Sequence, residues 1–95
     1  MKISRIIWLN RYANKIEIKH GVYRDEIRQV FSSNPHIRRV GKGKRHKDEH
    51  LYAAYGQTEA GRYLIIFFIR KISNEALVIS ARDMDGKERR QYGRK

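Results

Sequence analysis

A run of six consecutive apolar residues, Leu64 to Ile69, constrains the fold of this chain more than any other feature. Successive side chains of an extended strand point to opposite faces, so this run places apolar side chains on both faces at once. Such a strand must be covered on both sides, as the central strand of a layered sheet is. Segment 61–70 therefore predicts a buried central strand. The run is far shorter than the roughly 20 apolar residues that a membrane-spanning helix needs.

Neighbouring strands are predicted on both sides of this segment. Lys71 to Asn74 separate it from a second apolar segment, Ala76 to Ala81, and this spacing is typical of a four- or five-residue hairpin loop. Leu51 to Tyr55 predict a strand before it, which would complete an antiparallel meander. Two shorter extended pieces are predicted between Ile3 and Trp8 and between Ile37 and Val40.

Three helices are expected around these strands. Asn10 is placed to cap the first helix, which Gly21 ends, and the second lies between Tyr23 and Ser33. A short last helix runs through Tyr92, and the residues that could cap it are Asp83 and Asp85. The fold class predicted is therefore α+β, in one domain over residues 1–95. It has a small antiparallel sheet of about four strands, two N-terminal helices and a short C-terminal helix.

The charge of the chain indicates the kind of partner. Lys and Arg total 22 against 10 for Asp and Glu, which leaves a formal net charge of +12 on 95 residues. A small folded domain with this excess is suited to a polyanion such as nucleic acid. The chain has no cysteine, so disulfides and thiolate metal ligands are excluded and a hydrophobic core must supply the stability. No secretory signal is visible, and we expect a cytoplasmic protein.

The positive charges gather in two clusters, in segment 38–47 and at the C-terminal end. An alternative interpretation is that such clusters are only solvated loops and frayed ends, but the net charge favours contact with nucleic acid. The candidate RNA-binding residues are Arg38, Arg39, Lys42, Lys44, Arg45, Lys47 and Arg90.

No metal site or cofactor is predicted. His46 and His50 have a spacing that could bind zinc only on a helix, whereas the glycines and lysines beside them indicate a loop. What remains is metal-free cleavage of RNA, in which the 2′-hydroxyl attacks the adjacent phosphate. That reaction needs a proton acceptor, a proton donor and fixed positive charge. The candidate catalytic residues are Arg82, His20, Glu88, Arg89, Tyr92 and Lys19.

Each of these candidates also has a structural interpretation. Arg82 ends an apolar strand, where its guanidinium could face a phosphate or form an ion pair with Glu88 or Asp83. His20 could pack at the turn that ends the first helix. Tyr92 could anchor the last helix to the sheet. Glu88 is better suited to orienting arginines than to accepting protons, because an exposed carboxyl has a pKa of about 4.3.

The chain resembles the BrnT toxins of the RelE/ParE-like superfamily. The resemblance spans Trp8 to Tyr92, and its specificity lies in the combination of motifs. These are Trp8, Lys19-His20-Gly21-Val22, Asp25-Glu26, Val30-Phe31, Glu49 with Tyr52 and Gly56, Gly61-Arg62, Ile79-Ser80-Ala81-Arg82, and Glu88-Arg89-Arg90 with Tyr92. The chain departs from the family pattern at Leu9, Tyr12, Ile16 and Leu51.

The resemblance implies a RelE-like fold and the toxin of a type II toxin–antitoxin system, an endoribonuclease that arrests growth by cutting RNA. It also implies a DNA-binding antitoxin of the BrnA kind as partner. Because the toxin surface is basic, we expect that antitoxin to be acidic and the complex to weaken as salt rises.

Two other functions remain open at this point. One is a basic nucleic-acid-binding module without catalytic activity, and the other is a ParE-like toxin whose target is a protein. RNA that stays intact but bound would indicate the first, and growth arrest with damaged DNA would indicate the second.

Overall fold

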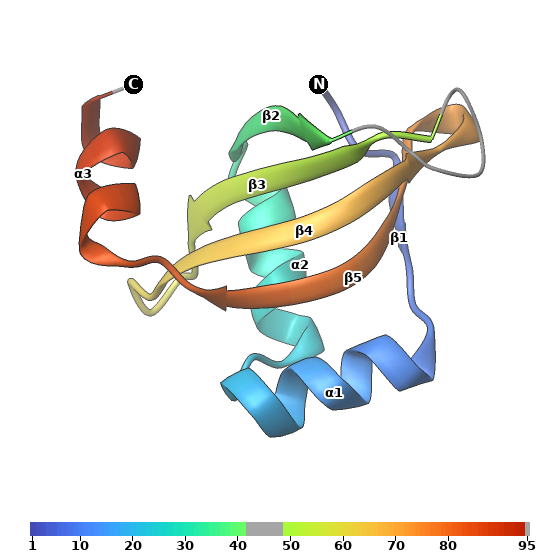
Figure 1. The fold of residues 1–95 in the computed structure, drawn as a ribbon, viewed down its shortest axis with the longest axis horizontal. Coiled ribbons are helices and arrows are strands. Elements are labelled where there is room, and N and C mark those ends of the chain that lie inside the picture. The colour runs from blue at the N-terminus through green and yellow to red at the C-terminus, as the bar shows by residue number, and fades with distance from the viewer. Residues whose placement is uncertain (42–48, 95) are drawn as a thin grey trace.

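The computed structural model describes residues 1–41 and 49–94. These residues form five strands and three α-helices in a mixed order along the chain. Figure 1 shows their arrangement. The elements are β1 (Arg5–Ile7), α1 (Asn10–His20), α2 (Arg24–Ser32), β2 (His36–Gly41), β3 (Leu51–Gln57), β4 (Tyr63–Lys71), a 3₁₀ turn (Ile72–Asn74), β5 (Glu75–Asp83) and α3 (Gly86–Arg94). None of the helices in these described ranges is long and apolar enough to cross a membrane.

The five strands form one sheet in the order β1-β5-β4-β3-β2. Strands β2 to β5 are the expected antiparallel meander, and the α+β class is confirmed. The count of about four strands was one too low, because β1 adds a fifth strand that runs parallel to β5. This strand lies in the extended piece predicted between Ile3 and Trp8, but its pairing with a strand about 70 residues away leaves no signal in the local sequence.

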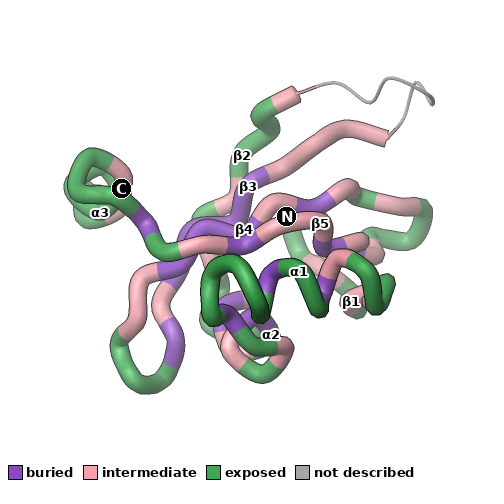
Figure 2. Tube along the Cα trace, turned by 60° about the horizontal axis from the view of Figure 1, so that its bottom comes forward, coloured by how far each residue is buried: buried purple, intermediate pink, exposed green. Residues whose placement is uncertain are grey.

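Strand β4 is buried on both faces, as its apolar run predicts. Leu64, Ile66 and Phe68 belong to a core on the side of α1 and α2, and Ile65 belongs to a second core on the opposite face. In Figures 1 and 2, α1 and α2 lie together on one side of the sheet, while α3 stands apart beyond the ends of β3 to β5. We call these the helix face and the α3 face of the sheet.

Two of the three residues predicted to cap or end a helix do so in the structure. Gly21, with φ of 61°, ends α1 in the left-handed conformation that glycine adopts most easily. Asp85 caps α3, because its carboxylate accepts the Glu88 N–H at 2.8 Å while Glu88 accepts the Asp85 N–H at 2.9 Å. The prediction that Asn10 caps α1 was wrong. Leu9 is the capping residue, and the Asn10 side chain instead accepts a hydrogen bond from Arg24 of α2.

Arg62, in the turn before β4, joins the two N-terminal helices to the end of β5. Its guanidinium donates to both carboxylate oxygens of Asp83, to both of Glu26 and to the backbone carbonyls of His20 and Gly21. The Arg62 side chain is only 29% exposed, so these bonds form in partial isolation from water. This group fixes the place where β5 leaves the sheet and turns into α3.

Gly56 of β3 allows α2 to pack closely on the sheet. A Cβ at this position would lie 2.9 Å from the Val30 Cγ1 of α2, closer than side chains normally approach. We therefore expect Gly56→Ala to destabilise the fold by about 1 to 3 kcal/mol, because a buried branched side chain must shift. Its melting temperature should fall by at least about 4 °C.

Gly93→Ala is the matched control, since a Cβ there meets no atom within 4 Å. Thermal unfolding followed by circular dichroism compares the two variants. Equal melting temperatures for Gly56→Ala and Gly93→Ala would contradict the close approach of α2 to β3.

Candidate active site

A hollow of about 240 Å³ lies on the α3 face, between β2, β3 and α3. Its walls carry side chains that are charged or that can donate or accept protons. They are His36, Arg38, Tyr55, Glu88, Gln91 and Tyr92. The volume is below the roughly 300 to 1,000 Å³ of pockets that enclose drug-sized molecules. A hollow of this size suits one group of a larger substrate rather than a whole small molecule.

The two strand positions His36 and Arg38 face the hollow because they alternate with Ile37 along β2. The ring of His36 lies 6.2 Å from the ring of Tyr55, its partner in register on β3. The Arg38 guanidinium lies over the same Tyr55 ring at 5.8 Å. Tyr55 is only 9% exposed, so it gives these two polar side chains a firm support.

Glu88, in the wall of the hollow, forms a bidentate ion pair with Arg82. The two terminal nitrogens of Arg82 donate to the two carboxylate oxygens of Glu88 at 2.7 and 2.8 Å. These hydrogen bonds hold the pKa of the Glu88 carboxyl below its usual value, and the nearby charge of Arg38 acts in the same direction. The pair likewise raises the pKa of Arg82. Glu88 is therefore ionised at neutral pH and fixes the direction of the guanidinium.

Aromatic contacts hold α3 against the sheet. The rings of Tyr63 and Tyr92 meet edge to face with centroids 6.1 Å apart, and Arg89 lies over the Tyr63 ring at 4.2 Å. Met84, in the turn before α3, is buried in the same cluster. The anchoring role of Tyr92 that the sequence suggested is thus present, while its side chain also lines the hollow.

One solved structure that shares this architecture is that of the ribonuclease toxin BrnT from Brucella abortus. The match has a TM-score of 0.60 and covers 85% of this chain and 96% of BrnT, at 20% sequence identity. The chain has the BrnT fold. No protein-family model matches the chain, and no curated protein matches its sequence. The resemblance drawn from the sequence is confirmed at the level of the fold.

On this BrnT fold, four of the residues that the sequence singled out come together at the hollow. They are Arg38, Arg82, Glu88 and Tyr92. Arg89 and Arg90 are exposed on α3 beside it. The Arg39 side chain points to the opposite face of the sheet from that of Arg38. Both residues pair with β3, as the extended piece predicted between Ile37 and Val40 implies.

The remaining predicted residues lie elsewhere. Lys19 and His20 end α1, and the described residues that line the hollow do not include them. The backbone of His20 reaches the site only indirectly, through Arg62 and Asp83. Their catalytic assignment stays a prediction. Four of the predicted RNA-binding residues, Lys42, Lys44, Arg45 and Lys47, lie outside the described residues, and so does His46.

Sequence reasoning did not name Tyr55 as a site residue. It also missed His36, which belongs to no group of three or more His, Asp or Glu side chains that could hold a metal ion among the described residues. The signal that could have found it is the strand period of two, because His36 and Arg38 must share a face once the extended piece around Ile37 is accepted. Tyr55 lies opposite His36 only through the register of β2 with β3.

The Arg82–Glu88 pair predicts how stability depends on pH. A carboxyl whose pKa is lowered in the folded state stabilises the fold above its unfolded pKa, and this contribution is lost as pH falls through the folded pKa. We expect Glu88→Gln to remove about 1 kcal/mol at pH 7, after allowing for solvent around the partly exposed Arg82. The amide can still cap α3, so the helix end is kept.

Urea unfolding between pH 7 and pH 3 measures this effect. Wild type should lose stability below about pH 4.5 more steeply than Glu88→Gln does. Glu17→Gln, which removes an exposed carboxyl on α1, serves as the control and should follow wild type. Parallel pH profiles for wild type and Glu88→Gln would contradict an ion pair at this position.

Proposed function

We propose that this chain is a metal-independent endoribonuclease of the toxin type. The observation that carries the proposal is the convergence of His36, Arg38 and Tyr92 on one small hollow, with the Arg82–Glu88 pair beside them. The fold shared with a ribonuclease toxin supports it, as does the net charge of +12. A single phosphodiester group suits the small volume of the hollow, where Arg38 can face it while Arg82 is paired with Glu88.

The reaction transfers the phosphorus from one oxygen to another. The RNA 2′-oxygen gives up its proton and bonds to the adjacent phosphorus, while the bond from phosphorus to the 5′-oxygen breaks and that oxygen takes up a proton. The products are a 2′,3′-cyclic phosphate and a free 5′-hydroxyl. Extra negative charge develops on the phosphate oxygens in the transition state, where fixed cations stabilise it.

Each residue of the hollow has a role in this reaction. His36 is the proton acceptor, because a neutral imidazole has a ring nitrogen with a free lone pair that can take a proton. Tyr92 is the proton donor on the other side of the hollow. Arg38 stabilises the phosphate directly. Arg82 contributes positive charge next to Glu88, which positions it. Glu88 is unsuited to act as base, because its lowered pKa leaves it a weak proton acceptor.

The surface around the hollow would gather the RNA. Arg89 and Arg90 stand exposed on α3, so phosphates on either side of the cleaved bond can contact them. The same basic surface would be neutralised by a cognate acidic antitoxin of the BrnA kind in a type II system, and cleavage of cellular RNA by the free toxin would arrest growth. We place this activity in the cytoplasm.

The test is RNA cleavage by purified protein in the presence of EDTA. We expect His36→Ala and Arg38→Ala each to lower kcat/KM by about 100-fold, since each removes one proton-transfer or charge-stabilising group. Arg39→Ala should lose much less, because its side chain leaves the neighbouring position toward the other face. Arg11→Ala, an exposed arginine of α1, controls for the loss of one positive charge.

Three results would contradict the proposal. Cleavage abolished by EDTA would require a metal, and equal activity of His36→Ala and wild type would place the chemistry elsewhere. RNA that is bound but stays intact would indicate a binding module instead.

A further inference from the structure

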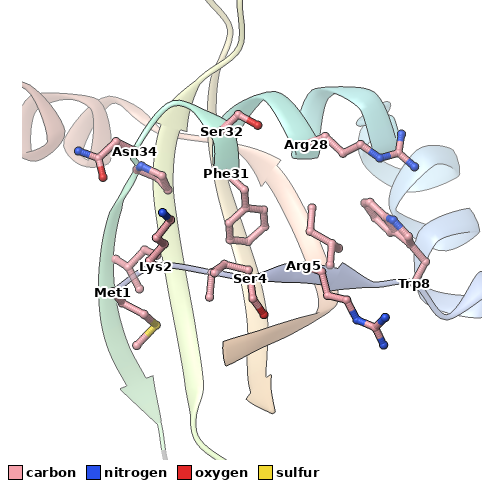
Figure 3. Close-up of a pocket in the computed structure, with 13 residues that line it drawn as sticks. Met1, Lys2, Ser4, Arg5, Trp8, Arg28, Phe31, Ser32 and Asn34 are labelled. Carbon is pink, nitrogen blue, oxygen red and sulfur yellow. The ribbon is translucent and has the colours of Figure 1, made fainter. Parts of the chain in front are cut away.

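A larger groove, of about 920 Å³, lies on the helix face of the sheet, on the other side from the hollow. It runs between the N-terminal segment, α2 and the start of β2. Figure 3 shows Phe31 pointing from α2 into its middle, with Met1, Lys2 and Asn34 toward one end and Arg5, Arg28 and Trp8 toward the other.

The inner surface of the groove is apolar. Ile3, Ile6, Phe31 and Ile37 are partly buried and pack against the helix-side core, so their inner sides are covered while their outer sides face the groove. The Phe31 ring is held edge to face against Phe68 at 5.3 Å. Covering such a surface with another apolar surface lowers the free energy, because both are removed from water.

The polar rim of the groove is positive. Lys2, Arg5 and Arg28 line it, and no carboxylate is among the described residues that do. Arg28 is paired with Asp25, whose side chain is 83% exposed, so that pair is weak and a carboxylate from outside can replace it. Arg5 is likewise 71% exposed beside its partner Glu75.

We propose that this groove docks an acidic, amphipathic segment of another protein. Apolar side chains of the segment would cover the isoleucines and Phe31, and its carboxylates would contact Lys2, Arg5 and Arg28. A groove of this kind, with an apolar centre and charged edges, matches the way an amphipathic segment binds.

Nucleic acid fits the groove less well despite the positive rim. Bases bind single-strand sites by stacking on aromatic faces. The inner surface here is largely aliphatic, and the guanidiniums of Arg24 and Arg28 already lie over the Trp8 ring at 5.5 and 5.4 Å. A second copy of this chain is disfavoured too, because two molecules of net charge +12 would meet at the same basic rim.

The groove and the hollow lie on opposite faces of one sheet, so a segment bound in the groove leaves the hollow open. The proposal is independent of RNA cleavage. Binding alone tests it, and a variant such as His36→Ala should bind the segment as wild type does.

The experiment uses synthetic 14-residue peptides with leucines at helical spacing and glutamates at the remaining positions. Trp8 is the single tryptophan of the chain, so its fluorescence and its indole N–H signal in NMR report on the groove without a label. Matched peptides carry glutamine or lysine in place of glutamate. A poly(dT) oligonucleotide serves as the nucleic-acid probe.

We expect saturable binding of the acidic peptide, with shifts at Trp8 and at the groove residues Ile3, Ile6, Arg28, Phe31 and Ile37. Lys2→Glu/Arg28→Glu should weaken it by at least about tenfold, because two attractive contacts become repulsive. Arg11→Glu/Lys15→Glu makes the same change of net charge on the exposed side of α1 and should weaken it much less. Circular dichroism verifies that both variants are folded.

The proposal is overturned if the glutamine or lysine peptide binds as tightly as the acidic one. It is equally overturned if the shifts map to His36, Arg38 and α3, or if both double variants weaken binding to the same extent. Tighter binding of poly(dT) than of the acidic peptide at Trp8 would assign the groove to nucleic acid instead.

Discussion

The Arg62 guanidinium is the interaction on which the arrangement of both faces depends. It bonds at once to Asp83 at the end of β5, to Glu26 at the start of α2 and to the last carbonyls of α1. The two hydrogen bonds from Arg62 to Asp83 hold the pKa of the Asp83 carboxyl below its usual value, so Asp83 remains charged at neutral pH. Because Asp83 directly follows Arg82, the Arg62 bonds that tie the two N-terminal helices to the sheet also fix the position of Arg82 at the end of β5.

The sheet then serves two different purposes on its two sides. On the helix face it is covered by α1 and α2, and the groove beside α2 remains open. On the α3 face a single short helix covers one end, held by Tyr63 and Tyr92, and this incomplete cover leaves the polar hollow. One set of strands can form both surfaces, because the side chains of neighbouring residues such as Arg38 and Arg39 point to opposite faces of the sheet.

Much of the fold could be predicted from the sequence because its signals are local. The apolar run of β4, the left-handed turn at Gly21 and the Asp85 cap each depend on a few adjacent residues. The parallel pairing of β1 with β5 could not, since it joins distant segments. The site was predicted in part: Arg82 and Glu88 are six residues apart, whereas His36 joins them only through the register of β2 with β3.

The most direct test of the central claim, that the hollow on the α3 face is where RNA is held, is NMR mapping with a short 2′-O-methyl oligoribonucleotide. The blocked 2′-oxygen prevents cleavage, so the complex persists during measurement. We expect the largest shifts at His36, Arg38, Tyr55 and Tyr92, which line the hollow. Shifts confined to Trp8 and the helix-face groove, with none at these four residues, would contradict the account.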